Sequence, residues 1–233
     1  MSSSLNNWLE PKILSGIIAA SLALWGFIEI AENVINGDIR YLDSTILIAL
    51  HRSGFSSLDW FNEFVRDISG LGGLGVLALL VSASVTFLVI SNNRKIATFV
   101  ALATLSGAIL SSLLKLGFDR PRPDLIPHLT HVYSASFPSG HAMVSAIVYL
   151  TLGALLTRVV SGFWTRFFLM IVAFSLTVLI GLSRLYLGVH WPSDVLAGWA
   201  AGATWALVWW IIANIINLEN GCKHPLNKNP NAR

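Results

Sequence analysis

The sequence predicts an all-α integral membrane protein, built as a bundle of six transmembrane helices. Only 12% of its 233 residues are charged and 55% are hydrophobic, whereas a soluble domain carries about 25% charged residues. Its apolar runs are also long enough to cross a bilayer, which takes about 20 residues of helix. We expect the six spans at residues 12–34, 71–91, 95–117, 141–160, 166–186 and 194–217.

The apolar runs predict helices within a single domain. Lipid offers no water to backbone polar groups, so only helices or a closed barrel can span it. Barrel strands alternate apolar and polar residues, whereas these runs are continuously apolar. No linker rich in Pro, Gly or Ser divides the chain, so we expect one transmembrane domain over residues 1–233 with a polar tail at 218–233. The single cysteine, Cys222, lies in this tail and excludes an internal disulfide.

Basic residues in the short loops predict the orientation of the helices, because short cytoplasmic loops are enriched in Lys and Arg. With six spans, one side of the membrane receives Lys12, Arg94, Lys95, Arg158, Arg166, Lys223, Lys228 and Arg233. We therefore expect the protein in the inner (plasma) membrane with both termini in the cytoplasm. Segments 35–70, 118–140 and 187–193 then face the outer, periplasmic or extracellular side.

The first outer segment, 35–70, contains an amphipathic pattern. Apolar residues recur at helical spacing with polar residues between them, at Leu58, Phe61, Phe64, Val65 and Ile68. This pattern predicts a short helix, which either lies along the membrane interface or caps the bundle. The glycines at 70, 72, 73 and 75 favour close helix packing at the start of the second span.

Polar residues gather in three clusters that the predicted topology brings to the outer face. The first runs from Lys115 to Pro123 at the end of the third span, and the second, 138–141, begins the fourth. The third, 183–194, links the fifth span to the sixth. Lys115, Arg120 and Arg122 depart from the charge rule on this side, and an anionic ligand would explain the departure.

The residue types of these clusters suit phosphoryl transfer. The cations Lys115, Arg122 and Arg184 can bind the non-bridging oxygens of a phosphate and offset charge that builds in the transition state. We expect Ser139 to be the N-cap of the fourth span. The N–H groups of residues 139–141 would then point at an anion, assisted by the helix dipole. Gly140 allows close approach of the backbone.

Two histidines complete the constellation. One of His141 and His190 can attack phosphorus while the other protonates the leaving oxygen. Asp194 follows His190 by four residues, which we interpret as one helical turn, so its carboxylate can accept a hydrogen bond from the imidazole. That bond would fix the tautomer and stabilise the cation formed on attack.

These clusters resemble the signature of the type-2 phosphatidic acid phosphatase family, K-x6-R-P, P-S-G-H and S-R-x5-H-x3-D. The three parts occur here in order, from Lys115 to Pro123, from Pro138 to His141 and from Ser183 to Asp194, without departure from the pattern. A complete match in three parts is specific, whereas any one part alone would be weak. The six-span layout extends the resemblance to most of the chain.

The resemblance implies a role for each matching residue. It makes His190 the nucleophile, Asp194 its support and His141 the general acid. It makes the phosphate-binding residues Lys115, Arg122, Ser139, Gly140 and Arg184. It further implies a phosphohistidine intermediate, no cofactor and no metal, and a lipid substrate such as phosphatidic acid, phosphatidylglycerol phosphate, diacylglycerol pyrophosphate or a polyprenyl diphosphate. Because the predicted site faces outward, undecaprenyl diphosphate and phosphatidylglycerol phosphate are favoured.

Other interpretations of the same residues remain open. Arg120 is outside the motif, and contact with headgroups or a structural role is favoured for it. Glu29 and Glu32 lie near the outer end of the first span, where they either reach water or have a function. A metal at His141, His190 and Asp194 is disfavoured, because nearby cations would repel it. The net charge of +3 does not indicate a nucleic-acid partner, so the expected partners are the lipid substrate and the surrounding membrane lipids.

Two other functions compete with lipid hydrolysis. A phosphotransferase of the same architecture would pass the phosphate to a second lipid, and no residue here distinguishes the two reactions. An anion or lipid transporter would use the cations as its binding site. Transporters more often show repeated halves and broken helices near the bilayer midplane, whereas these charges lie at one membrane face.

Overall fold

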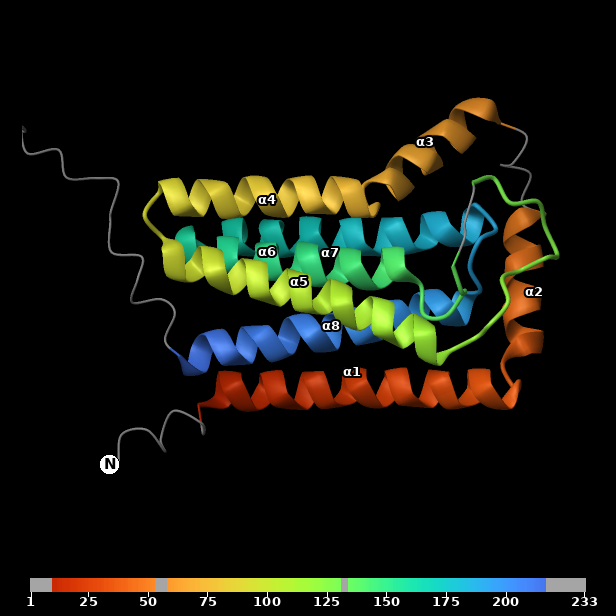
Figure 1. The fold of residues 1–233 in the computed structure, drawn as a ribbon, viewed down its shortest axis with the longest axis horizontal. Helices are drawn as coiled ribbons and strands as arrows, with labels where there is room; N and C mark the ends of the chain where they lie inside the picture. Colours follow the sequence, from red (N-terminus) through yellow and green to blue (C-terminus); the bar gives the residue numbers. More distant parts are fainter. Residues whose placement is uncertain (1–9, 53–57, 131–133, 217–233) are drawn as a thin grey trace, which may run out of the picture.

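The computed structural model describes residues 10–52, 58–130 and 134–216, and every regular element in these ranges is an α-helix (Figure 1). This confirms the all-α class. The helices are α1 Pro11–Asn36, α2 Arg40–His51, α3 Asp59–Gly70, α4 Leu74–Ile90, α5 Arg94–Gly117, α6 Gly140–Val159, α7 Phe163–Tyr186 and α8 Pro192–Ile215. The predicted polar tail at 218–233, with Cys222, lies outside the described residues.

Five helices of the described chain, α1, α5, α6, α7 and α8, are long and apolar enough to cross a membrane. The remaining predicted span, 71–91, corresponds to α4, which has only 17 residues. It meets the same criterion when joined to α3, from which it is bent by 48°. The structure therefore supports five spans, or six if α3 and α4 form one broken span. Helix α4 and the five long helices lie along the long axis of the bundle in Figure 1.

Helix α6 lies at the centre of the bundle, packed against α5, α7 and α8, while α1 packs on the outer side of α8. Small residues allow α6 and α8 to approach closely. A methyl group on Gly198 would lie 2.7 Å from the Ser139 carbonyl oxygen, and one on Gly202 would lie 2.6 Å from that of Met143. This contact brings the start of α6 against the start of α8.

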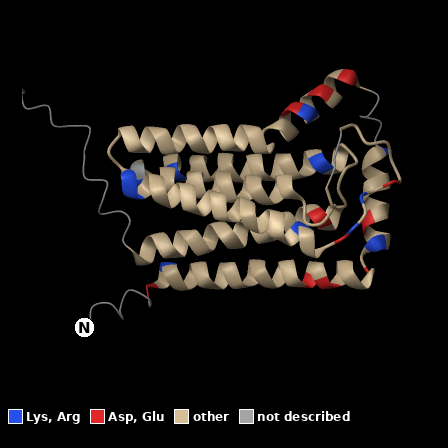
Figure 2. Ribbon diagram, viewed as in Figure 1, with Lys and Arg blue, Asp and Glu red and all other residues tan. Residues whose placement is uncertain are grey.

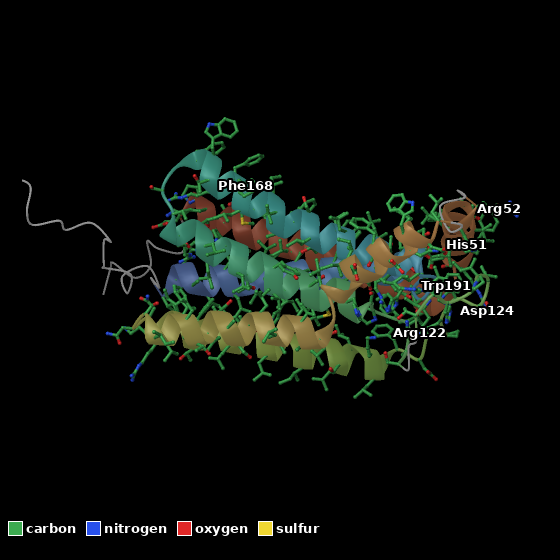
Figure 3. The ribbon with its side chains drawn as sticks, turned by 90° about the horizontal axis from the view of Figure 1, so that it is seen from above. His51, Arg52, Arg122, Asp124, Phe168 and Trp191 are labelled. Atoms are coloured by element: carbon green, nitrogen blue, oxygen red, sulfur yellow. The ribbon has the colours of Figure 1, made fainter. Side chains whose placement is uncertain are left out.

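The surface of the bundle is apolar along its length. Large side chains such as Trp25, Leu105 and Phe168 are each more than 60% exposed, and Figure 3 shows Phe168 on the side of the bundle. Charged residues lie mainly near the two ends of the bundle (Figure 2). A surface of this kind is stable against lipid, so the chain is a multi-pass membrane protein.

The outer segment between α1 and α4 contains two helices, where the sequence analysis predicted one. Helix α3 matches the predicted amphipathic pattern, and its Val65 and Phe61 pack against Leu187 and Val189 beyond α7. This contact agrees with the capping alternative, while a location along the membrane interface stays a prediction. Helix α2 was not predicted, and it crosses the end of the bundle (Figure 1).

Helix-capping residues determine where α1 ends and where α8 begins, both at this end of the bundle. Helix α1 stops at Gly37, whose φ of 81° is left-handed and therefore favours glycine. Helix α8 begins with Pro192 at its first position, where the missing N–H costs nothing. The backbone N–H of Trp191 donates to the Asp194 carboxylate at 2.9 Å. This bond gives a partner to one of the N–H groups at the helix start that have none within the helix.

Candidate active site

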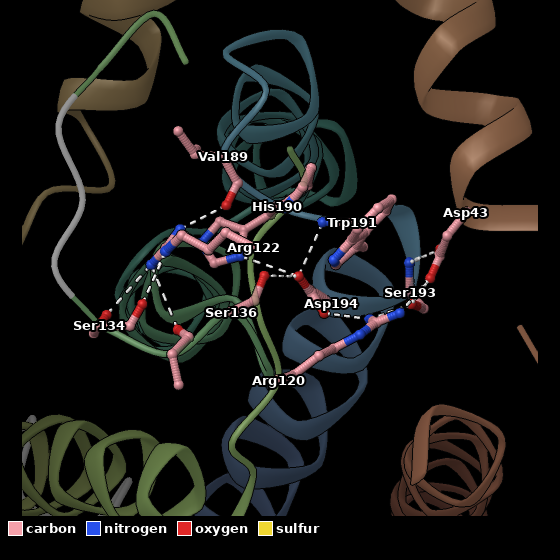
Figure 4. Close-up of polar contacts among 12 residues, drawn as sticks. Asp43, Arg120, Arg122, Ser134, Ser136, Val189, His190, Trp191, Ser193 and Asp194 are labelled. Carbon is pink, nitrogen blue, oxygen red and sulfur yellow. Dashed lines mark hydrogen bonds and ion pairs between the residues drawn. The ribbon is translucent and has the colours of Figure 1, made fainter. Parts of the chain in front are cut away.

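The three predicted clusters lie together at one end of the bundle. Figure 4 shows polar contacts of the first and third clusters there. The first comes from the end of α5 and the loop that follows it. The second is the start of α6, and the third connects α7 to α8. Arg122 Nη1 of the first cluster lies 3.4 Å from His190 Nε2 of the third. The backbone N–H of Ser139 in the second cluster donates to the Asp194 carbonyl of the third at 2.9 Å. The predicted convergence at one face is therefore confirmed.

His190 and Asp194 form the centre of the site. The imidazole Nδ1 lies 3.3 Å from Asp194 Oδ2, and both side chains are buried. The predicted contact is present, but its predicted cause was wrong. His190 does not lie on a helix one turn before Asp194; it precedes α8, and the Asp194 carboxylate folds back over the helix start to reach it.

The neighbours of His190 determine its tautomer. Arg122 Nη1 lies 3.4 Å from His190 Nε2. A guanidinium can only donate hydrogen bonds, so Nε2 faces it with a lone pair and Nδ1 carries the proton donated to Asp194. The ring nitrogen that points towards the cations is therefore the nucleophilic one.

Burial keeps this imidazole uncharged. Desolvation lowers the pKa of His190 to about 4, and the hydrogen bond to Asp194 acts in the opposite direction without cancelling it. At neutral pH the lone pair on Nε2 is therefore available for attack.

The Asp194 carboxylate is held from several directions. Its Oδ2 accepts the Ser136 hydroxyl as well as the N–H of Trp191, and its Oδ1 accepts Arg120 Nη1 at 2.5 Å (Figure 4). A carboxylate with this many donors stays ionised and keeps its orientation. Such a carboxylate can stabilise a positive charge on the His190 imidazole.

Lys115 and Arg122 are anchored by hydrogen bonds to the two loops beside the site, between α5 and α6 and between α7 and α8. Lys115 Nζ donates to Ser134 Oγ at 3.1 Å and to the Ala135 carbonyl at 3.3 Å. Arg122 donates to the carbonyl oxygens of Ser134 at 2.8 Å and Val189 at 2.6 Å. These partners are neutral, so the contacts orient both cations without neutralising them.

Arg184 and Ser139 each have a buried polar atom available for a ligand. Arg184 Nη1 donates to Ser69 Oγ on α3 at 2.8 Å. Its Nε and the Ser139 hydroxyl have no hydrogen-bond partner among the described residues. A buried polar group without a partner is costly, and a phosphate oxygen would satisfy both atoms.

The start of α6 agrees only in part with its prediction. Ser139 occupies the N-cap position, as expected, but its side chain makes no capping hydrogen bond. Its backbone N–H donates to the Asp194 carbonyl at 2.9 Å. Only the N–H groups of the residues after Ser139 can therefore face an anion. A methyl group on Gly140 would lie 3.2 Å from Lys115 Cε, so the glycine permits the close approach of Lys115.

His141 and the buried Arg184 line a cavity of about 160 Å³. Its other walls come from Arg184, from Leu187 and Thr130, and from the α3 residues Arg66, Ser69 and Gly70. His141 interacts electrostatically with His190 and with the three cations. The structure therefore brings together all eight residues that the sequence analysis selected, although their individual roles stay predictions. No group of three His, Cys, Asp or Glu side chains with metal-binding geometry occurs in the described ranges, and a metal-free reaction likewise stays a prediction.

Sequence reasoning missed four residues of this site. Ser134 and Ser136 lie between the first two motifs, and Asp43 lies on the unpredicted helix α2. Arg120 was expected to contact headgroups or to have a structural role, and it binds Asp194 and Asp43. The only available signal for Asp43 was an acidic residue within the apolar pattern of residues 40–51.

The chain is similar to known proteins in sequence and in fold. Phosphatidylglycerophosphatase B of Bacillus subtilis is 36% identical over 150 residues, covering 61% of this chain and 70% of that protein. An undecaprenyl-diphosphatase of Sulfolobus acidocaldarius is 28% identical over 128 residues, covering 53% of this chain and 58% of that protein. The crystal structure of a transmembrane PAP2-type phosphatidylglycerolphosphate phosphatase from Bacillus subtilis superimposes with a TM-score of 0.72 at 29% identity, covering 82% of this chain and 94% of that one.

A family model also matches the part of the chain that carries the site. The match covers residues 96–217, from the start of α5 to the end of α8, and therefore includes all three motifs. It spans more than half of the 233 residues. The chain is a member of the PAP2 superfamily.

Proposed function

We propose that this chain is a membrane lipid phosphatase that hydrolyses a lipid phosphate at His190. One observation carries the proposal. Lys115, Arg122 and Arg184 have no carboxylate partner within 4 Å among the described residues. Arg122 lies 3.4 Å from the neutral imidazole of His190, which a buried carboxylate orients. Cations that are buried or half-buried without a carboxylate partner favour a bound anion, and the relatives named above are phosphatases of anionic lipids.

The first chemical step transfers the phosphoryl group to the enzyme. His190 Nε2 attacks phosphorus, and the bond between phosphorus and the lipid oxygen breaks. His141 gives its proton to that leaving oxygen. Lys115, Arg122 and Arg184 bind the non-bridging oxygens, and Asp194 stabilises the imidazolium that forms. The negative charge of the bound phosphate offsets the surrounding cations and so favours the protonated form of His141 that this step needs.

The second step releases phosphate to water. His141, now neutral, takes a proton from a water molecule in the space that the leaving group vacated. The hydroxide attacks phosphorus, and the bond between phosphorus and His190 Nε2 breaks. The products are inorganic phosphate and the starting tautomer of His190, with His141 protonated for another cycle.

The cavity beside His141 supports a substrate that carries a second phosphate group. The leaving group must lie next to the general acid, and Arg66 adds a cation to the wall of the same cavity. Undecaprenyl diphosphate, phosphatidylglycerol phosphate and diacylglycerol pyrophosphate carry a second phosphate in the leaving group, whereas phosphatidic acid does not. Together with the proposed outward-facing site, this favours the first two as substrates.

The arrangement of charges supports an outward-facing site. Arg94 begins α5 and Arg166 lies near the start of α7. Both helix starts lie at the end of the bundle opposite to the site (Figure 1). With the usual excess of basic residues on the cytoplasmic side, the termini face the cytoplasm of a cell whose inner (plasma) membrane holds the protein. An Asp124→Cys variant in a Cys222→Ser background should react with an impermeant thiol reagent on intact cells, and Ser91→Cys at the opposite end should not. The reverse pattern would refute this orientation.

The activity is tested by phosphate release from a panel of lipids, with EDTA present. The panel contains phosphatidic acid, phosphatidylglycerol phosphate, diacylglycerol pyrophosphate and undecaprenyl diphosphate, and His190→Ala is the control. Release by the wild type that is lost in the variant supports the proposal, and absence of any release contradicts it. If labelled phosphate appears on a second lipid instead, the chain is a phosphotransferase. Arg66→Gln should reduce kcat/KM for the substrates with a second phosphate more than for phosphatidic acid.

A further inference from the structure

Arg120 occupies a position that the first motif leaves unspecified, yet it joins two buried carboxylates beside the proposed nucleophile. Its Nη1 donates to Asp194 Oδ1 at 2.5 Å and its Nη2 donates to Asp43 Oδ2 at 2.6 Å (Figure 4). The exposed fraction of the side chain is 13% for Arg120, 2% for Asp43 and 0% for Asp194. Buried ion pairs of this kind hold their partners in one geometry, and the removal of one partner leaves a charge uncompensated.

Asp43 also ties helix α2 to the start of α8. Its Oδ1 accepts the backbone N–H of Ser193 at 2.9 Å, and its Oδ2 accepts the Ser193 hydroxyl at 2.5 Å. The same hydroxyl oxygen accepts Arg120 Nη1 at 2.7 Å. The four side chains of Asp43, Arg120, Ser193 and Asp194 therefore form a closed network, which joins α2, the loop after α5 and α8 directly behind His190.

This network controls the orientation of the Asp194 carboxylate. Three donors reach Oδ2, namely His190, Trp191 and Ser136, whereas Arg120 is the ion-pair partner at Oδ1. Without the guanidinium, Oδ1 would be buried without its ion pair, and rotation of the carboxylate towards other donors would move Oδ2 away from His190.

The network also sets the charge that His190 experiences. Asp43, Arg120 and Asp194 together carry one net negative charge, which is what a developing imidazolium requires. If Asp43 were neutral, the full charge of Arg120 would act on Asp194 and weaken its support of His190. Asp43 therefore affects the nucleophile through two intervening groups.

We infer that Arg120 and Asp43 are positioning residues for the nucleophile of the proposed phosphatase reaction, on which this inference rests. They hold the Asp194 carboxylate in the orientation that His190 needs and balance its charge. Neither belongs to the motif signature, and neither lies in the set of cations that faces the phosphate. Helix α2 thereby gains a role in catalysis, because it supplies the carboxylate that completes the network.

Two substitutions separate positioning from simple structural support. Arg120→Lys keeps the charge but loses the planar fork that spans two carboxylates, and Asp43→Asn keeps the shape but removes the charge. Each should lower kcat by about 10- to 100-fold, the usual effect of removing a group that orients a functional histidine. KM should change by less than about twofold, because the phosphate contacts are unaffected. The double variant should lose less than the product of the two single effects, because the residues act as one unit.

Matched controls lie on exposed positions of the same segment. Asp38→Asn and Arg40→Lys make the same chemical changes outside the network, and both should keep wild-type kcat. Thermal unfolding in detergent measures stability separately, and kcat is expressed per folded enzyme. A purely structural role would lower the unfolding temperature and leave kcat per folded molecule unchanged.

Each outcome of the experiment has a distinct meaning. If the wild type releases phosphate, His190→Ala does not, and both network variants keep wild-type kcat, the inference is wrong and the proposed function stands. If the wild type is inactive or His190→Ala is fully active, the proposed function itself fails. If Arg120→Lys or Asp43→Asn does not fold, Ser193→Ala tests the inference instead, because it removes only the hydroxyl that contacts both Arg120 and Asp43. A fall in its kcat at constant KM supports the network, and an unchanged kcat contradicts it.

Discussion

A single carboxylate oxygen, Asp194 Oδ2, lies 3.3 Å from His190 Nδ1 and accepts the backbone N–H of Trp191 at 2.9 Å. The two contacts hold the His190 imidazole and the backbone of Trp191 next to the same oxygen atom. The orientation of the His190 imidazole, the proposed nucleophile, therefore depends on Asp194 in the first turn of α8. This relationship makes Asp194 the first residue to test.

Asp194→Asn should lower kcat by about 10²- to 10⁴-fold, the range expected when a histidine loses its orienting carboxylate. An asparagine has one acceptor oxygen, whereas donors surround both oxygens of Asp194. Its NH₂ group would oppose a donor in either orientation, and the tautomer of His190 would no longer be fixed. Initial rates check this prediction, with Asp67→Asn on the exposed face of α3 as the control. Activity within about twofold of the wild type would contradict it.

The buried His190 should make the protein less stable as the pH falls. Its folded-state pKa is about 4, below the ordinary value near 6.5. The unfolded chain therefore binds a proton first, and stability that is fully present above pH 6.5 is lost as the pH falls towards 4. Between pH 7 and 5 the loss should be about 2 kcal/mol. Between pH 7 and 5 the unfolding temperature should fall more steeply for the wild type than for His190→Gln. Equal slopes of unfolding temperature against pH would contradict the prediction.

Arg184→Lys should lower kcat/KM by about 10²- to 10³-fold, the cost of one lost donor to transition-state charge. Arg184 Nη1 is held by Ser69, and the unpartnered Nε is available to a phosphate oxygen. A lysine keeps the charge but cannot make both contacts. Ser69→Ala removes only the anchor, so kinetic comparison should show a smaller loss. Equal activities for the wild type and Arg184→Lys would show that Arg184 does not bind phosphate.

Gly198→Ala should destabilise the bundle by about 1–3 kcal/mol, because the added methyl group overpacks the contact between α6 and α8. The methyl would lie 2.7 Å from the carbonyl oxygen of Ser139, a backbone atom of the site. Activity should fall together with the unfolding temperature. Gly26→Ala on α1 is the matched control, since no neighbouring atom of the described residues lies within 4 Å of its added methyl group. An unchanged unfolding temperature for Gly198→Ala would contradict this account of the packing.

The sequence predicted the bundle and the convergence of the motifs because both depend on simple regularities. Apolar runs of about 20 residues must be helices in lipid. Successive spans alternate in direction, so clusters at 115–123, 138–141 and 183–194 must meet at one end. The position of Ser139 at the start of α6 follows from the same logic. The use of its backbone N–H by Asp194 depends on the packing of α8 against α6, which local sequence does not contain.

Helix α2 and its carboxylate could not be predicted in the same way. The helix has only 12 residues, too few to cross a bilayer, so it lies within the outer segment 35–70, outside every predicted span. Asp43 is an acidic residue of this segment, yet it is buried. Its pairing with Arg120 joins residues separated by 77 positions, and no local spacing encodes such a contact.

Phosphate release from undecaprenyl diphosphate and phosphatidylglycerol phosphate, by purified wild type and His190→Ala in parallel, tests the central claim most directly. His51→Ala, which alters a histidine at the same end of the molecule outside the site, serves as the matched control. The account predicts release by the wild type and by His51→Ala, and loss of at least about 10³-fold in His190→Ala, because removing a nucleophile abolishes the covalent pathway. Near wild-type release by correctly folded His190→Ala would show that another group attacks phosphorus.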